Sequence, residues 1–442
     1  MILHYLPLRQ CFSARRVSRI WYSILSAPKT VDSILEWWYP KLEVMDTLST
    51  IPEGLSPEAI ASLRAEHVDA FRTGRPFGVI TLDLSCFSNW LDARCIAYAD
   101  GVVAWADRID SRTVYALDLR TGFRRSLVPE DRSSVTDISL SSSMIAVFST
   151  SGKCHVWTTL KEERFSFRLP SAQVKTILVS GSTLAISWPP VCVDNTRRAE
   201  ILIWDLSTQR TSSFFITLSQ KQSQHRENKM ILDGNGGTLF YFERMFEDDS
   251  REMQQIFFKR TNLSGHILGE GVLDLALDTT WHDISGSRNN GVGGTVTPWA
   301  FADMSNPSTV DDPNVLQVSY NFKQGNLVSQ VQRVDDLDKH DVRTSEFFFW
   351  KDVIYMFGVS NELGIPAEKI SIIDLRESSL HRIDVAAMKI QPQLWAEIER
   401  SGPLYLFGDE NLILVLHPLG LIAWSFDKHL RLAAEDVEEN EG

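Results

Sequence analysis

Features that mark enzymes, metal proteins and membrane proteins are scarce in this sequence. No two of the five cysteines form a CxxC pair, so neither a zinc ribbon nor a dithiol redox site is indicated. No apolar run reaches the roughly 18 residues of a membrane-spanning helix. No glycine-rich turn is followed by the Lys-Ser or Lys-Thr of a phosphate loop. We therefore expect a non-enzymatic protein with no catalytic, cofactor or metal site, and buried free thiols in the reducing cytoplasm or nucleus.

Two polar motifs resemble functional sites but fit ordinary turns better. Residues 335–341 hold four aspartates, yet a calcium loop that starts at Asp336 needs Gly at its sixth position and Glu at its twelfth. Asp341 and Phe347 stand at those two positions, so a solvated turn is expected. The Trp-His-Asp of residues 281–283 could form an acid–base pair, but such a pair is more often structural.

Basic and acidic residues are unevenly distributed along the chain. Its 442 residues carry a formal net charge of −13, which repels phosphate backbones, so nucleic acid is not an expected partner. Residues 1–31 nevertheless contain five basic residues and no Asp or Glu. The last eight residues, 435–442, contain five acids and no base, and we expect residues 433–442 to form a disordered tail.

Residues 1–35 have the apolar spacing of a helix. The apolar side chains recur three and four positions apart, at Val17, Ile20, Trp21, Ile24 and Leu25. Ser13 is the expected N-cap, and Pro28 is expected to stop the helix soon after Ser26. Pro7 should end an upstream helical segment and begin a turn. The arginines of this region are also compatible with a mitochondrial transit peptide. That alternative leaves the tryptophan unexplained, because a transit peptide does not require one.

Residues 36–76 are predicted to connect this helix to a larger domain. The aromatic residues 37–39 are too apolar for a free linker and are expected to pack where the two parts meet. Ser56 should cap a second helix, with Pro57 at its first position and Thr-Gly-Arg-Pro of residues 73–76 after its end. Its apolar stripe consists of Ile60, Leu63, His67 and Phe71.

From residue 77 to residue 432 the pattern changes to short strands separated by turn residues. The expected strand segments are 79–84, 95–105, 113–119, 144–148, 153–158, 177–179, 183–188, 200–206, 238–242, 255–260, 315–322, 346–350, 353–357, 369–375, 404–407, 412–416 and 420–426. Many short strands without intervening helices indicate a mainly β sandwich, barrel or propeller. About 350 residues are too many for one sandwich.

A repeat within this region favours the propeller. Several strands end in Asp or a substitute, followed by polar turn residues. The landmarks are Asp118, Thr158, Asp205, Asn262, Asn321, Asp374 and Asp427, at intervals of 40, 47, 57, 59, 53 and 53 residues. WD-type blades recur at about 40–45 residues and kelch blades at about 50. Seven landmarks predict seven four-stranded blades, with six as the alternative.

The arrangement of a propeller leads to further expectations. Residues 79–84 are a candidate extra strand that closes the ring against the C-terminal blade. The polar inserts 219–229 and 285–297 are expected to be loops on one face and to carry the partner site. An acidic propeller favours a partner with a basic patch. The propeller should also fold without residues 1–70, so a protease-resistant fragment is expected to start near Phe77.

Residues 2–26 resemble the second half of an F-box. The family's pattern is a Leu-Pro turn, a short helix, then Val-Ser-Arg-x-Trp and an apolar pair. Its matches here are Pro7, Val17, Ser18, Arg19, Trp21 and Leu25. With the aromatic linker and a degenerate propeller, the chain is similar to fungal F-box proteins with WD-like repeats. The family's opening Leu-Pro-x-Glu helix has no counterpart, so we expect a truncated F-box or a start upstream of Met1.

The resemblance implies that a Skp-type adaptor binds this segment and links the chain to a cullin-RING ubiquitin ligase, whose target the propeller would recognise. The implied adaptor-binding residues are Leu3, Leu6, Pro7, Leu8, Val17, Ser18, Trp21 and Leu25. Physical reasoning agrees, because a helical hairpin of about 30 residues cannot bury its own apolar face. A propeller scaffold without ligase coupling is the alternative, and co-purification with the adaptor would separate the two. A propeller hydrolase is a third possibility, since fold alone implies no chemistry.

Overall fold

The structure is a computed structural model of the whole chain. It describes residues 14, 17–25, 27, 30, 57–83, 93–106, 110–159, 163–218, 226–233, 236–246, 253–276, 281–283, 291–292, 295–303, 314–322, 324–334, 337, 345–350, 353–358, 369–375, 378–384, 388–389, 405–409, 411–417, 420–428, 430 and 432. The predicted tail 433–442 and the aspartate-rich residues 335–341, apart from residue 337, lie outside these ranges.

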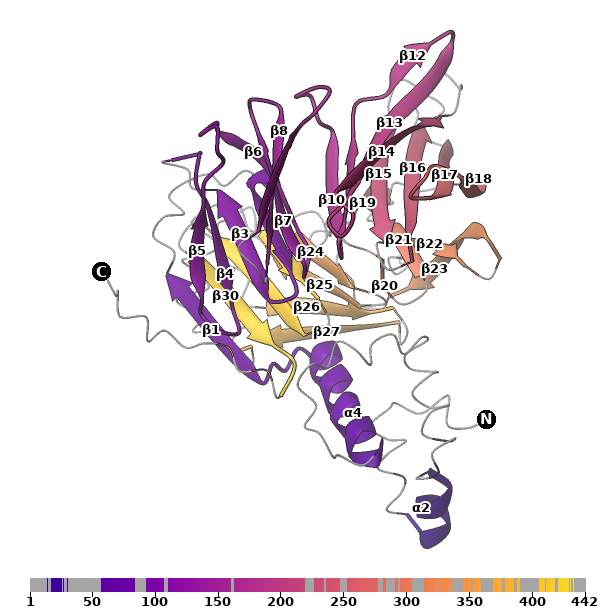
Figure 1. Cartoon of the computed structure of the whole chain (residues 1–442). Coiled ribbons are helices and arrows are strands. Elements are labelled where there is room, and N and C mark those ends of the chain that lie inside the picture. Colours follow the sequence, from indigo (N-terminus) through magenta and orange to yellow (C-terminus); the bar gives the residue numbers. More distant parts are fainter. Residues whose placement is uncertain are drawn as a thin grey trace, which may run out of the picture.

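The main body is a β-propeller of seven antiparallel sheets, as the landmark repeat predicts (Figure 1). Each of the first three sheets in chain order has four strands or more. They are β2 (Ile96–Ala99), β3 (Val102–Ala106), β4 (Val114–Asp118) and β5 (Arg124–Leu127); β6 (Val135–Leu140), β7 (Met144–Ser149), β8 (Lys153–Thr158) and β9 (Arg164–Arg168); and β10 (Thr176–Ser180), β11 (Thr183–Ser187), β12 (Val191–Val193), β13 (Thr196–Asp205) and β14 (Arg210–Thr217).

The remaining sheets complete the ring. They are β15 (Arg226–Asp233), β16 (Thr238–Phe246), β17 (Met253–Asn262) and β18 (Ile267–Ala276); β19 (Trp281–Asp283), β20 (Gly291–Val292), β21 (Thr295–Asp303), β22 (Asn314–Asn321) and β23 (Asn326–Arg333); β24 (Ser345–Trp350), β25 (Val353–Gly358), β26 (Lys369–Asp374) and β27 (Ser379–Asp384); and β28 (Tyr405–Gly408), β29 (Leu412–His417), β30 (Gly420–Ser425) and β1 (Gly78–Asp83). The fold is therefore mainly β with seven blades, and the six-bladed alternative is wrong.

The core is divided among the seams between neighbouring blades. Seven hydrophobic clusters are present, and each combines side chains from two sheets that follow one another around the ring. At one seam, for example, Leu184 and Trp204 pack with Met144 and Val156 of the preceding sheet. Burial of such a side chain contributes about 1.5–3 kcal/mol, so each blade is stabilised mainly by its neighbours.

The ring is closed by a strand from the N-terminal side of the propeller. β1 pairs antiparallel with β30, from Gly78 opposite Ser425 to Asp83 opposite Gly420. β1 is thus the outermost strand of the last blade, and the prediction of a closing strand at 79–84 is confirmed within one residue. Closure pairs the first propeller strand with the last, which protects the edge that β30 would otherwise expose.

All seven landmark residues lie at the end of the third strand of a blade, or two residues beyond it for the last. Their side chains explain the preference for Asp and Asn. The Asp118 carboxylate accepts the backbone N–H of Arg120 at 2.8 Å, and the Asn262 side-chain oxygen accepts the N–H of His266 at 2.8 Å. Such bonds shape the turn that leads into the fourth strand.

Sequence reasoning missed twelve of the described strands, and the fourth strands are half of them. The others are β6, β12, β15, β19, β20 and β21, of which β15, β20 and β21 overlap the inserts 219–229 and 285–297 that were expected to be loops. β5, β9, β14, β18, β23 and β27 were not among the expected segments, since their outer position leaves polar and charged side chains exposed along them. The single expected strand 95–105 is in fact two strands, β2 and β3. Asp100 and Gly101 form the turn between them with φ of 47° and 78°, so this Asp-Gly pair was the available hairpin signal.

Two described helices precede the propeller. α2 spans Arg19–Leu25, and α4 spans Pro57–Thr73. α4 begins at the proline and ends before Gly74, as the sequence predicts. Figure 1 shows both helices on the lower side of the ring, with α4 against it and α2 farther away. We call this the lower face, where the third strands end, and the opposite one, where the first strands begin, the upper face.

Candidate protein-interaction surfaces

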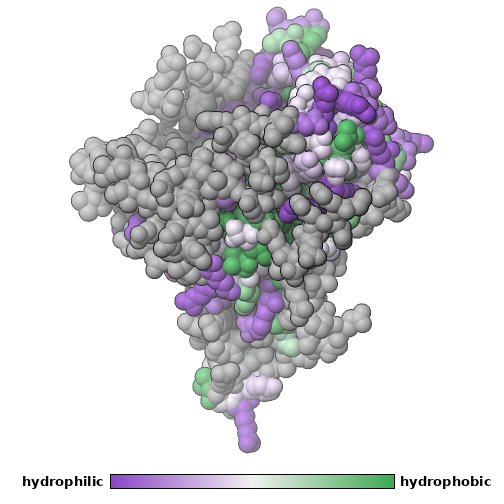
Figure 2. Space-filling model, turned by 90° about the vertical axis from the view of Figure 1, so that its left-hand side faces the viewer, coloured by the Kyte–Doolittle hydropathy of each residue, from purple (hydrophilic) through white to green (hydrophobic). Residues whose placement is uncertain are grey.

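The short helix α2 exposes most of its apolar side chains. Val17 and Ile20 are each 72% exposed, Ile24 is 52% exposed, and Trp21 is 39% exposed. In Figure 2, apolar surface is visible at the lower end of the molecule, where Figure 1 places α2. Exposed apolar side chains at helical spacing form a face that a partner helix can cover. We call these four residues the α2 face.

The structure places four of the eight predicted adaptor-binding residues. Val17 and Trp21 belong to the α2 face. Ser18 caps the helix, because its Oγ accepts the backbone N–H of Trp21 at 3.2 Å; the expected cap, Ser13, lies outside the described residues. Leu25 is 1% exposed and is therefore buried within this chain instead of at the surface. The others, Leu3, Leu6, Pro7 and Leu8, lie outside the described residues.

The C-terminal turn of α4 is built into the propeller core. Phe71 is 1% exposed and lies in the cluster between the last two blades. Its ring makes edge contacts with Tyr355, at a centroid distance of 5.4 Å, and with Phe426, at 5.0 Å. The Tyr355 hydroxyl also donates a hydrogen bond to the Phe71 carbonyl. The contact fixes one end of the connector to a single seam of the ring.

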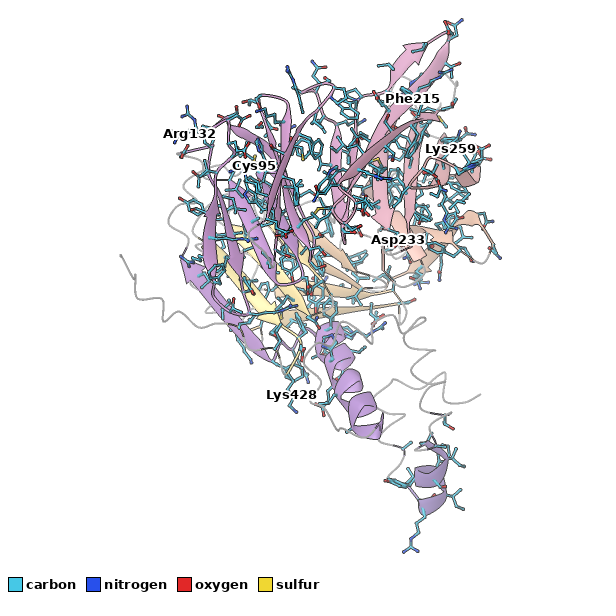
Figure 3. All side chains as sticks on the ribbon, viewed as in Figure 1. Cys95, Arg132, Phe215, Asp233, Lys259 and Lys428 are labelled. Carbon is cyan, nitrogen blue, oxygen red and sulfur yellow. The ribbon has the colours of Figure 1, made fainter. Side chains whose placement is uncertain are left out.

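Polar contacts orient α4 on the lower face. Arg72 pairs with Asp374, the landmark residue of its blade, whose side chain is 2% exposed. A second ion pair joins Glu66 to Lys428 at 3.3 Å on the surface, where Figure 3 labels Lys428. Gly74 ends the helix with φ of 62°, and a Cβ there would clash with Ile383 Cδ1. A larger residue at position 74 would therefore displace this packing.

The described parts of the two polar inserts do not lie on one face, which corrects the sequence-based expectation. Residues 226–229 are the start of β15, at the upper face, whereas residues 219–225 lie outside the described residues. The second insert runs from β19 to β21 and contains the β20–β21 pairing, at the lower face. Because neighbouring strands run in opposite directions, these two kinds of connection necessarily lie at opposite ends of the blades.

One projection on the upper face was not anticipated from the sequence. β13 is ten residues long, whereas β4 and β8 have five and six. Its first half extends above the ring and pairs with β12 on one side and with the end of β14 on the other (Figure 1). We call residues 191–200 and 213–217 the finger.

The described part of the chain holds no cluster of three or more metal-ligating side chains. Of the cysteines expected to be buried, Cys154 is, and burial raises the pKa of its thiol; Cys95 is half-buried and Cys192 is exposed. Cys11 and Cys86 lie outside the described residues. No helix in the described ranges is both long enough and apolar enough to cross a membrane.

The buried His417 makes stability depend on pH. Burial lowers the pKa of its imidazole from 6.5 to about 4. The unfolded chain takes up this proton near pH 6.5 and the folded chain only near pH 4, so stability is lost as pH falls between those values, by about 1 kcal/mol per unit. When the pH is lowered from 7.5 through 6.5 to 4.5, we expect the melting temperature of His417→Gln to fall less than that of wild type.

Thermal unfolding across this pH range would measure the difference. His266, which is exposed, provides the matched control, since His266→Gln should retain the wild-type pH dependence. If the melting temperatures of wild type and His417→Gln depend on pH in the same way, His417 is not the residue that makes the protein less stable in acid.

Comparisons with known proteins bear only on the fold. No family model matches this chain, and no curated protein matches it. The chain is similar to the β-propeller domain of the Trilobed protease from Pyrococcus furiosus, at 10% identity over 78% of this chain and 94% of that one, with a TM-score of 0.42. It is also similar to the WD40 domain of SCAP from fission yeast, at 10% identity over 80% and 99%, with a TM-score of 0.36. The seven sheets of the structure by themselves show a seven-bladed β-propeller.

Proposed function

We propose that this chain is the substrate-recognition subunit of a Skp-cullin-F-box type ubiquitin ligase. In this proposal a Skp-type adaptor covers the α2 face, and the propeller binds the protein to be modified. The role is non-catalytic, because the ubiquitin-transfer chemistry belongs to the other subunits. The chain would act in the cytoplasm or the nucleus, with no cofactor.

The exposure of the α2 face is the observation that carries the proposal. Ile20, Trp21 and Ile24 of α2 and Val17 just before it are exposed to solvent. The sequence from Val17 to Trp21 resembles the F-box pattern. Leaving such side chains exposed forfeits about 1.5–3 kcal/mol for each that could be fully buried. Exposed apolar side chains at neighbouring helical positions are typical of interaction sites.

The anchoring of α4 supports the division of labour between the two parts. Phe71 and Arg72 hold the end of α4 at one seam on the lower face. The adaptor-binding segment is thereby kept on the side of the ring opposite the finger. A target on the upper face and an adaptor below the ring would not compete for the same surface.

Substitution of Trp21 by alanine is expected to weaken binding to a purified Skp-type adaptor by about 30- to 1000-fold. The loss of a buried tryptophan anchor typically costs about 2–4 kcal/mol. Titration calorimetry with the full chain would measure it. Ile20→Asp should weaken adaptor binding to a comparable extent, because a carboxylate would then be buried in the interface. The substitution should cost little folding stability, because Ile20 is 72% exposed in the free chain.

Phe123→Ala is the matched control for adaptor binding. Phe123 is 64% exposed, and it lies in the turn between β4 and β5 instead of on α2. Its replacement should leave adaptor affinity unchanged. Equal adaptor binding by wild type, Trp21→Ala and Ile20→Asp would eliminate the ligase proposal and favour a propeller scaffold without ligase coupling.

A further inference from the structure

The finger has one face that is packed and one face that is not. Residues directly opposite each other in its three strands share a face, and positions two apart along a strand share it too. Ala199 and Ile216 belong to the packed face, where they contact Met230, Leu239 and Tyr241 of the next blade. The finger is thereby held in place by apolar contacts at its base.

An ion pair completes the attachment of the packed face. Arg197 donates to the Glu243 carboxylate at 2.7 Å across the seam, and the Glu243 side chain is fully buried. Removing one partner from a buried pair typically costs about 3–5 kcal/mol, because a charge is left uncompensated. The direction in which the finger projects is therefore well determined.

The opposite face of the finger is apolar and exposed. Val191 is 52% exposed, Val193 43% and Phe215 57%. The register places Val191 opposite Arg198, and Phe215 opposite Glu200, so all five side chains share this face. Figure 3 labels Phe215 at the upper face. We call these five residues the finger face.

The backbone of the finger is conformationally restricted at its tip and at its entry, which favours a binding role. Its tip is a two-residue turn in which Asp194 and Asn195 have φ of 50° and 59°. Turns of this type match the twist of the two strands that they join. Pro189 and Pro190 precede β12 and restrict the chain that enters it. The surface that a partner contacts is therefore preformed, and binding costs little entropy for ordering the finger.

Arg198 determines which partner chemistry fits the finger face. Its side chain is partly exposed and makes no hydrogen bond or ion pair with the described residues. Glu200 is on the same face, two residues along β13, and no described ion pair joins the two. A carboxylate placed beside Arg198 would supply the missing acceptor in a charge-assisted bond. Apolar side chains on either side of that carboxylate would cover Val191, Val193 and Phe215.

We propose that the finger face binds a protein segment in which an Asp or Glu is flanked by apolar side chains. The net charge of −13 still favours partners whose wider surface is basic, because long-range attraction depends on the whole charge distribution. The local contact is distinct from that attraction. A polyphosphate chain does not fit as well, since it has no apolar side chains to cover Val191, Val193 and Phe215.

This inference rests on the proposed function only in treating the propeller as the target-binding part, and it requires no adaptor. Failure of adaptor binding by the α2 face would leave it untouched. Failure at the finger face would likewise leave the adaptor proposal standing, because the two surfaces lie on opposite sides of the ring.

Selection from a phage-displayed library of random linear peptides on the immobilised full chain would test the proposal. We expect the selected peptides to carry Asp or Glu between apolar residues. Their affinity should fall about tenfold or more on Phe215→Ser and on Arg198→Glu, and remain unchanged on Phe123→Ser, whose phenylalanine is exposed outside the finger. Unchanged melting temperatures would show that the variants are folded.

A charge exchange would separate a direct contact from a structural effect. Replacing the peptide's acid by Lys should abolish binding to wild type and restore binding to Arg198→Glu, because the interacting charges are then reversed together. The proposal is overturned if no peptides are selected, if the selected peptides lack the acid, or if they bind both finger variants as tightly as wild type.

Discussion

Phe71→Ala is expected to lower the free energy of unfolding by about 3–5 kcal/mol. Deletion of a buried phenylalanine side chain loses its transfer free energy and leaves a cavity. The cavity would open between Tyr355 and Phe426, whose rings now contact Phe71 at 5.4 and 5.0 Å. Stability measured by urea unfolding of the full chain would show the change. The total free energy of unfolding of a protein is typically only about 5–15 kcal/mol, so the effect is large.

Glu66→Ala is the matched control on the same helix. Glu66 pairs with Lys428, but both side chains are about half exposed, so the pair contributes little. Its replacement should therefore leave the unfolding midpoint nearly unchanged. If Phe71→Ala is as stable as Glu66→Ala, the end of α4 is not part of the propeller core.

Deletion of the closing strand is expected to have a still larger effect. A variant that starts at Leu84 lacks β1, including Leu82 and the half-buried Val79 and Ile80. Losing their burial costs about 5 kcal/mol or more, which is comparable with the stability of a whole domain. β30 would also present an unpaired edge. We expect this variant to lose cooperative unfolding and to aggregate.

Two longer variants serve as controls for this deletion. A chain that starts at Ser56 keeps α4 and β1 and should unfold with the wild-type midpoint. A chain that starts at Phe77, the boundary expected from the sequence, keeps β1 but lacks Phe71 and Arg72, so it should fold with a lower midpoint. Near-ultraviolet circular dichroism and size-exclusion chromatography would rank the three. A compact, cooperatively folded chain starting at Leu84 would show that the ring does not depend on β1.

Local pattern was sufficient to predict the repeat. Strands buried in the seams are continuously apolar or alternate, and their ends carry Asp or Asn because these side chains bond to the turn that follows. Asp118 and Asn262 are examples, and the same logic located α4, whose first residue is Pro57. Ring closure by residues 79–84 followed from the need to pair an open edge.

Pattern was insufficient for most strands whose side chains face solvent, and it also missed β21, in which residues 299–301 are buried. Outer strands such as β5, with the sequence Arg-Arg-Ser-Leu, carry mostly polar residues and lack the apolar alternation by which a strand is recognised. β9 was missed although Phe165 and Phe167 alternate with polar residues. The Asp-Gly of residues 100–101 shows a different failure, since this hairpin signal was present but was read as part of one strand.

By itself the sequence predicted the fold class, seven blades with six as the alternative, a strand at residues 79–84 and the apolar spacing of the helix that contains Trp21, because each of these is a pattern of residues close together in the chain. Only the tertiary structure decided that Phe71 lies inside a blade seam, that Leu25 is buried whereas Trp21 is partly exposed, and that the described parts of the two inserts lie at opposite faces. These outcomes depend on which distant segments meet. Burial of a given side chain is set by its neighbours in space, and a linear pattern does not contain them.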